Sequence, residues 1–186
     1  MINRELYMEQ ITPFIDKPFV KVITGIRRCG KSVVLRLIRE ELLRRGVSED
    51  YIIYMNFESF EWIDMKEAKA LYAHIREATK APGKYYILLD EIQEVTDWEK
   101  AVNAFLVDLD VDIYVTGSNS RLLSSEFSTY LAGRYVAFHI MTLSFREYLL
   151  FHDLPLTISV SDRKTEFLKY LRMGGFPAIH TENYDY

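Results

Sequence analysis

The stretch VITGIRRCGKSVVLRL, residues 22–37, joins a β-branched apolar run to an amphipathic segment through a loop with two glycines. Within it, Gly25-x-x-x-x-Gly30-Lys31-Ser32 satisfies the complete phosphate-loop pattern. Glycines let the backbone curl so that successive N–H groups point inward, and the following helix adds the positive end of its dipole. The pattern therefore predicts a loop around a nucleotide's phosphates, with Lys31 reaching the β- and γ-phosphates and the Ser32 hydroxyl binding Mg²⁺.

The loop itself contains charged and reactive residues that need separate interpretations. Arg27 and Arg28 either assist phosphate binding or form an interface or a solvated pair. Cys29 is the only cysteine, so a redox switch would have no resolving thiol, and a small residue that fits the loop is the favoured interpretation. The alternative for the whole motif is a turn that holds no ligand. The candidate nucleotide contacts are Gly25, Ile26, Arg27, Arg28, Cys29, Gly30, Lys31, Ser32 and Val33.

Two adjacent carboxylates end a second apolar run, YYILLDEIQ, residues 85–93. Asp90 is expected at the edge of the sheet, where it can hold Mg²⁺ through water, and Glu91 is expected to polarise the attacking water. An acidic pair after an apolar strand can also be structural or solvated, and the upstream phosphate loop favours the functional interpretation. The chain has no Asn-Lys-x-Asp sequence for reading guanine, so adenine is the preferred base.

Further polar residues follow the later strands. In VDIYVTGSNSRLL, residues 111–123, Ser118 or Asn119 could contact the γ-phosphate or the attacking water, or could simply form a turn and a helix cap. Arg134 precedes the last strand and either faces the nucleotide of a neighbouring subunit or is a surface or ion-paired arginine. Arg121 is a weaker candidate for the same role, and Glu58 either approaches the γ-phosphate or faces solvent.

The alternation of short apolar runs with amphipathic segments predicts an α/β fold around a mainly parallel sheet. Capping-box spacing places helix starts at Thr96 with Glu99 and at Ser144 with Glu147. A last helix within residues 161–177 is expected to stop at its Gly-Gly-Phe-Pro end. We expect an ATPase core over residues 1–155, and over residues 156–186 the start of a helical lid or C-terminal region that is cut short. The expected strands are residues 19–24, 51–57, 85–90, 111–116 and 135–141, and residues 31–45 are expected to be helical.

The composition limits the possible partners. The 186 residues carry a net charge of -4, which argues against a surface that holds nucleic acid by phosphate neutralisation alone. Four arginines of residues 36–45 could form a local basic face, but a solvated helix face is the favoured interpretation. No apolar run approaches the length of a membrane span, and the charged N-terminus does not resemble a secretory signal. We therefore expect a cytoplasmic protein with no membrane partner.

Five segments together resemble a known family: VITGIRRCGKS, YMNFES, ILLDEIQEVTDWEKAV, YVTGSNSRLLSSEFSTYLAGRY and LSFREYLLF. In this order they are similar to the prokaryotic ATPases of the AAA_14 type within the AAA+ superfamily, usually joined to a C-terminal nuclease-like domain of unknown function. The resemblance implies a P-loop NTPase of the additional-strand type, a three-layer sandwich with strand order 5-1-4-3-2. It also implies ATP and Mg²⁺ as ligands.

The resemblance assigns roles motif by motif. Residues 25–32 would be Walker A, Asp90 and Glu91 Walker B, Ser118 and Asn119 sensor one, and Arg134 the arginine finger of a homo-oligomer. The family's sensor-two arginine and partner domain do not occur within these residues. DNA is therefore an expected partner only through that missing domain.

The leading functional hypothesis is Mg²⁺-dependent ATP hydrolysis that drives a conformational change in an attached C-terminal domain. One alternative is a nucleotide-dependent binding switch with little hydrolysis. A small-molecule kinase is a weaker alternative, because no arginine-rich closing segment is recognisable in the sequence.

Overall fold

Five mainly apolar segments form one sheet in which every pair of neighbouring strands is parallel. The computed structural model describes residues 4–118, 122 and 131–181. The strand order is β2-β3-β4-β1-β5, which is the order that the family resemblance implied. Every residue of β1 and β3 is buried, as expected for strands covered by helices on both faces. The strands are β1 (Val20–Gly25), β2 (Ile52–Asn56), β3 (Tyr85–Asp90), β4 (Val111–Gly117) and β5 (Tyr135–Ile140).

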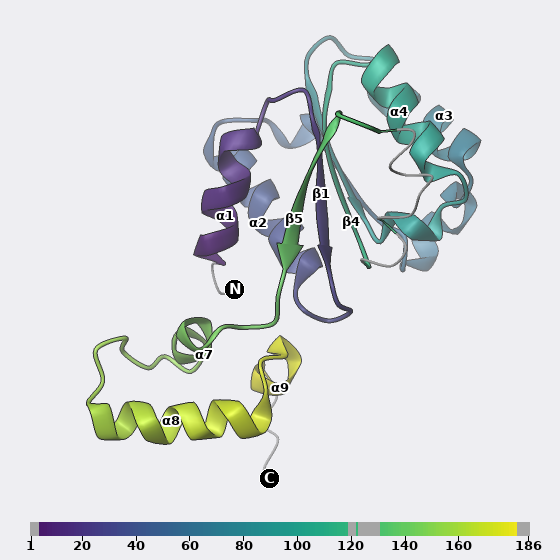
Figure 1. Cartoon of the computed structure of the whole chain (residues 1–186). Coiled ribbons are helices and arrows are strands. Elements are labelled where there is room, and N and C mark those ends of the chain that lie inside the picture. The colour runs from purple at the N-terminus through teal and green to yellow at the C-terminus, as the bar shows by residue number, and fades with distance from the viewer. Residues whose placement is uncertain (1–3, 119–121, 123–130, 182–186) are drawn as a thin grey trace.

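Helices cover the two faces of this sheet (Figure 1). Because side chains alternate along a strand, Ile87 and Leu89 of β3 belong to one hydrophobic core, and Tyr86 and Leu88 belong to the other. The first core lies under α3 (Ala68–Ala78) and α4 (Trp98–Asp108), and the second under α1 (Glu5–Ile11) and α2 (Lys31–Arg44). Short 3₁₀ turns connect these elements at Thr12–Phe14, Glu49–Tyr51, Phe60–Met65 and Ile92–Glu94.

Three more helices follow β5 and extend away from the sheet (Figure 1). They are α7 (Phe145–Phe151), α8 (Val160–Met173) and α9 (Pro177–Thr181). The expected capping box at the start of α7 is present, since the Ser144 hydroxyl accepts from the Glu147 backbone and the Glu147 carboxylate accepts from the Ser144 backbone. Within the described residues, no helix has the length and apolar content needed to cross a bilayer.

One of the expected helix starts is wrong, and the expected end of the last helix is confirmed. Thr96 does not cap α4, because its backbone forms a parallel bridge with Glu67, and the helix begins after Asp97 in a left-handed conformation. The helix expected within residues 161–177 stops where predicted, since α8 ends at Met173 and Gly174 is its C-terminal cap residue. Pro177 is the first residue of a further short helix, α9, a position where proline's fixed φ and missing N–H are tolerated. The segment after Gly-Gly-Phe-Pro also packs, since the His180 ring contacts the Tyr148 ring edge-on at 5.2 Å.

Candidate functional site

The predicted phosphate loop connects the carboxyl end of β1 to the first turn of α2. A Cβ atom on Gly25 would lie 2.4 Å from the Ile140 carbonyl oxygen and 2.7 Å from the Cys29 sulfur. No other residue can therefore occupy this position without displacing its neighbours. Gly30, with φ of 105°, is the N-terminal cap residue of α2. Both glycines of the motif are thus required by the backbone, independently of any ligand.

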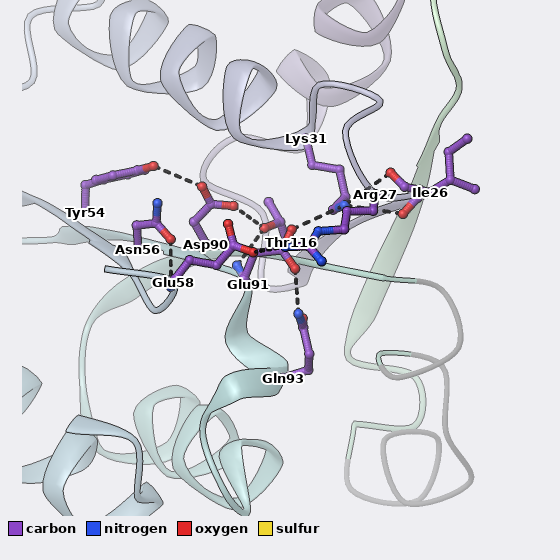
Figure 2. A network of polar contacts seen from close by, with 11 residues as sticks. Ile26, Arg27, Lys31, Tyr54, Asn56, Glu58, Asp90, Glu91, Gln93 and Thr116 are labelled. Atoms are coloured by element: carbon purple, nitrogen blue, oxygen red, sulfur yellow. Dashed lines mark hydrogen bonds and ion pairs between the residues drawn. The ribbon is translucent and has the colours of Figure 1, made fainter. Parts of the chain in front are cut away.

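Lys31 lies across the mouth of the loop and is only 4% exposed. Its Nζ is 3.4 Å from the carbonyl oxygens of Gly25 and Ile26 and 3.3 Å from Oε1 of Glu91 (Figure 2). The structure therefore brings together the lysine of the loop and the second carboxylate of the acidic pair, which are 60 positions apart in the sequence.

Asp90 is fully buried at the end of β3. One carboxylate oxygen accepts from the Thr116 hydroxyl and the other accepts from the Tyr54 hydroxyl at 3.0 Å. Burial and the nearby Asp90 charge raise the pKa of Tyr54, so this phenol remains a donor at neutral pH. Both contacts orient the carboxylate in its buried position.

Glu91 leaves the strand in a left-handed conformation, with φ of 55°. Its backbone N–H donates to the Thr116 hydroxyl at 2.9 Å, and its Oε2 accepts from Nε2 of Gln93 at 2.5 Å. A glutamate in this backbone region is uncommon and is typical of functional sites. Oε1 of Gln93 is buried and has no hydrogen-bond partner among the described residues. Gln93 was not predicted as a site residue.

A cavity of about 590 Å³ opens beside the loop. One side is formed by residues of the loop and of α2, together with Glu58 and Glu91. The other side was not predicted: it consists of Arg4 near the N-terminus and of residues from the segment that follows β5. Leu143 and Phe151 are the first and last residues of the LSFREYLLF segment that contributed to the family resemblance, but nothing in the sequence indicated that they line the site. These wall residues are Leu143, Phe151, Pro177 and Ala178.

A smaller cavity of about 280 Å³ adjoins the first. Glu91, Gln93 and Ser118 line it, and Lys31 borders both cavities. Ser118 therefore lines the same cavity as Glu91, and its role as a sensor stays a prediction. Asn119 and the weaker candidate Arg121 lie outside the described residues.

The charged residues of the loop differ in their surroundings. Arg27 is exposed and pairs with Glu58 at 3.3 Å, across the mouth of the cavity. Arg28 is also exposed and has φ of 65°.

Cys29 is buried, and this burial raises the pKa of its thiol. A buried, protonated thiol fits the interpretation of a small packing residue better than that of a redox switch.

Arg134 lies at the other end of the sheet. Its carbonyl oxygen accepts from the N–H of Val20, the first residue of β1, whereas the phosphate loop follows the last residue of that strand. Its guanidinium donates to Oδ1 of Asn103 at 3.1 Å. A six-residue strand is about 20 Å long, so Arg134 cannot reach the phosphate loop of its own chain.

The donor set at the loop is suited to Mg²⁺. The Ser32 hydroxyl and the Asp90 carboxylate are hard oxygen ligands, and Mg²⁺ typically takes one or two such groups together with phosphates and waters. In the described part of the chain, no group of three histidine, cysteine, aspartate or glutamate side chains could form a protein-only metal cage.

Comparison with known proteins identifies similar chains. A family model described as an AAA domain matches residues 17–149. An uncharacterized protein of Haemophilus influenzae is 43% identical over 182 residues, which are 96% of this chain and 44% of that protein. An uncharacterized protein of Methanocaldococcus jannaschii is 35% identical over 184 residues, covering 96% of this chain and 39% of the relative. The chain thus spans less than half the length of these curated relatives.

Solved structures share the fold. The AMPPCP-bound DnaA of Aquifex aeolicus superimposes with a TM-score of 0.61 at 14% identity, over 97% of this chain and 60% of that one. The ORC1 protein of Aeropyrum pernix, solved in complex with DNA, superimposes with a TM-score of 0.55 at 16% identity. The match covers 97% of this chain and 58% of the ORC1 chain. At such low identity the likeness shows the architecture alone.

Proposed function

The chain belongs to the AAA domain family, and from this premise we propose that it binds ATP with Mg²⁺ at the phosphate loop and hydrolyses it. One observation carries the proposal. A complete phosphate loop, Lys31, and the carboxylates of Asp90 and Glu91 converge at one edge of the sheet, beside a cavity of about 590 Å³. Cavities of this size are typical of small-molecule and cofactor sites.

Each residue has a role that its position supports. The loop N–H groups and the N-terminus of α2 hold the phosphates, and Lys31 exchanges its contact with Glu91 for the β- and γ-phosphates. Ser32 and, through water, Asp90 would hold Mg²⁺. When bound, Mg²⁺ offsets the charge of the β- and γ-phosphates. The candidate contacts from Ile26 to Cys29 and at Val33 contribute mainly through their backbone.

Glu91 would orient the attacking water from the smaller cavity. Its carboxylate is held by Gln93 on one side, and the departure of Lys31 toward the phosphates frees the other oxygen. Gln93 and Ser118 both line this smaller cavity beside Glu91. These features support a water-directed reaction.

The apolar residues of the cavity wall suit the base and ribose. Leu143, Phe151 and Pro177 lie opposite the loop, where they would exclude water from one side of the nucleotide. Because Pro177 belongs to α9, the nucleotide would touch the C-terminal helices directly. Through this contact, nucleotide binding alone could move these helices, which is what the second candidate function, a nucleotide-dependent switch with little hydrolysis, requires.

The region after β5 is the proposed link to a larger protein. We retain the division into a core, residues 1–155, and the start of a lid or C-terminal region, residues 156–186. The length of the relatives supports a further domain, to which the ATP cycle would transmit a conformational change. Any contact with DNA is proposed for that domain only.

Replacing Asp90 with asparagine tests the Mg²⁺ role. In titration calorimetry we expect the unmodified chain to bind ATP at least tenfold more tightly with Mg²⁺ than with a chelator. D90N should lose that difference, because the amide is neutral while its shape still fits between Tyr54 and Thr116. Asp97→Asn is the matched control, since Asp97 is an exposed carboxylate outside the site. Absence of binding heat in the folded, unmodified chain would refute the proposed function.

We also propose a homo-oligomer in which Arg134 faces the nucleotide of a neighbouring copy. Arg134→Ala and Lys31→Ala should each lower hydrolysis by about a thousandfold when assayed alone. Mixing the two proteins should restore part of the activity, because the K31A copy supplies Arg134 to the intact loop of the other. If mixing restores nothing, Arg134 is instead a packing residue beside Asn103.

A further inference from the structure

Arg4 is a buried cation at the edge of the nucleotide cavity. Its side chain is 3% exposed, and its guanidinium lies 4.7 Å above the Tyr7 ring. Each of its three nitrogens donates to a different segment: Nη1 to the Cys29 carbonyl at 3.0 Å, Nη2 to the Met141 carbonyl at 2.9 Å, and Nε to Oε1 of Glu147 at 2.5 Å. The phosphate loop, the end of β5 and helix α7 therefore meet at one side chain.

The contact with Cys29 fixes one peptide of the phosphate loop. In a trans peptide the C=O and the following N–H point in opposite directions. Arg4 holds the Cys29 carbonyl, so the N–H of Gly30 points away from Arg4. An anion-binding loop needs its N–H groups turned inward and its carbonyls turned outward. Arg4 thus holds the peptide between Cys29 and Gly30, the N-terminal cap residue of α2, in one orientation, which we assign to the anion-binding conformation.

The contact with Glu147 extends this constraint to α7. Glu147 divides its two oxygens: Oε1 accepts from Arg4, and Oε2 accepts from the backbone and hydroxyl of Ser144 in the capping box. The start of α7 and the loop peptide are therefore joined through two side chains. The same helix contributes Phe151 to the cavity wall.

We propose that Arg4 is a positioning residue of the nucleotide site, which couples the anion-binding conformation of the loop to the position of α7 through its ion pair with Glu147. The proposal rests on the proposed nucleotide function. It assigns a regulatory connection: a displacement of α7 releases the Cys29–Gly30 peptide and weakens phosphate binding, and a bound nucleotide in turn holds α7 in place.

The Glu147→Gln variant distinguishes a positioning role for Arg4 from a purely electrostatic one, because the two roles predict opposite changes in ATP affinity. If Arg4 only attracts phosphate, Glu147→Gln removes the compensating negative charge and should tighten binding. If Arg4 positions the loop, the same variant should weaken ATP binding. The single side-chain oxygen of glutamine cannot accept both from Arg4 and from Ser144, as the two oxygens of Glu147 do. The capping box retains that oxygen, since glutamine also serves in such boxes, and Arg4 then faces an amide NH₂.

The test uses Arg4→Lys and Glu147→Gln, with Arg146→Gln as the matched control. Lysine keeps the charge, but its single nitrogen cannot reach the three acceptors that the three guanidinium nitrogens of Arg4 contact. Arg146 also joins the N-terminal helix to α7, through an exposed ion pair with Glu5 at 3.7 Å. Hydrogen–deuterium exchange of residues 26–34 is measured without nucleotide, and ATP affinity is then measured by calorimetry with Mg²⁺. Circular dichroism melting verifies that each variant is folded.

We expect R4K and E147Q each to speed exchange in the loop at least tenfold and to weaken ATP binding at least tenfold, and R146Q to match the unmodified chain within twofold. Loop exchange that does not change in folded R4K and E147Q, or tighter ATP binding by E147Q, would overturn the proposal. If the unmodified chain binds no ATP, the proposed function fails, while the exchange data still decide the role of Arg4.

Discussion

Lys31→Ala is expected to weaken ATP binding at least a hundredfold in titration calorimetry with Mg²⁺. The Lys31 ammonium is nearly buried at the mouth of the loop, within 3.4 Å of two loop carbonyls and 3.3 Å from Glu91. Charge-assisted contacts to two phosphates contribute about 1.5–3 kcal/mol each, which together correspond to about a hundredfold or more in affinity. Alanine also leaves the Glu91 carboxylate unopposed, facing the incoming phosphates.

Lys66→Ala is the matched control for this experiment. Lys66 pairs with Glu94 at 3.9 Å, and Glu94 borders the smaller cavity, so this lysine lies close to the site without lining either cavity. We expect K66A to bind ATP like the unmodified chain. A K31A protein that binds ATP within threefold of the unmodified chain would contradict the phosphate-loop interpretation as a whole.

Glu91→Gln is expected to retain ATP binding and to lower phosphate release at least a hundredfold, as for loss of a general base. The amide cannot accept a proton from water. Binding should be equal or slightly tighter, because Lys31 no longer pairs with a carboxylate in the nucleotide-free protein. Steady-state phosphate release and calorimetry on the same preparations separate the two effects.

Glu94→Gln provides the comparison, since it changes a second carboxylate that borders the same small cavity. It should preserve turnover. If E91Q releases phosphate at the unmodified rate, Glu91 is not the base. If the unmodified chain binds ATP but releases no phosphate, the nucleotide-dependent switch becomes the better description.

The parts of the structure that are encoded locally could be predicted. The phosphate loop lies between β1 and α2 as its glycine spacing indicated, and Asp90 ends β3 because an apolar run stops there. The strand order came from the family resemblance, because the pairing of Lys21 with Tyr114 depends on contacts between distant segments. The roles of the site residues stay predictions until the variants are measured.

Other parts depended on contacts that no local pattern carries. Arg4 lies in a charged N-terminal segment that matches none of the motifs, and its partners Cys29, Met141 and Glu147 are known only from the fold. Gln93 contacts Glu91 because the 3₁₀ turn Ile92–Glu94 brings its side chain back toward the carboxylate, and no motif indicated this contact. The predicted helix start at Thr96 is wrong because it also depends on a distant segment: the backbone of Thr96 forms a bridge with Glu67.

The strand order also affects how the protein matures on the ribosome. β1 carries the phosphate loop, yet its two hydrogen-bonding neighbours are β4 and β5, which are synthesised much later. Until Ile140 has emerged, this apolar strand has an open edge, the kind of surface that promotes aggregation. A nascent chain arrested before β5 should therefore be a chaperone client, and the proposed nucleotide site should form among the last features of the core.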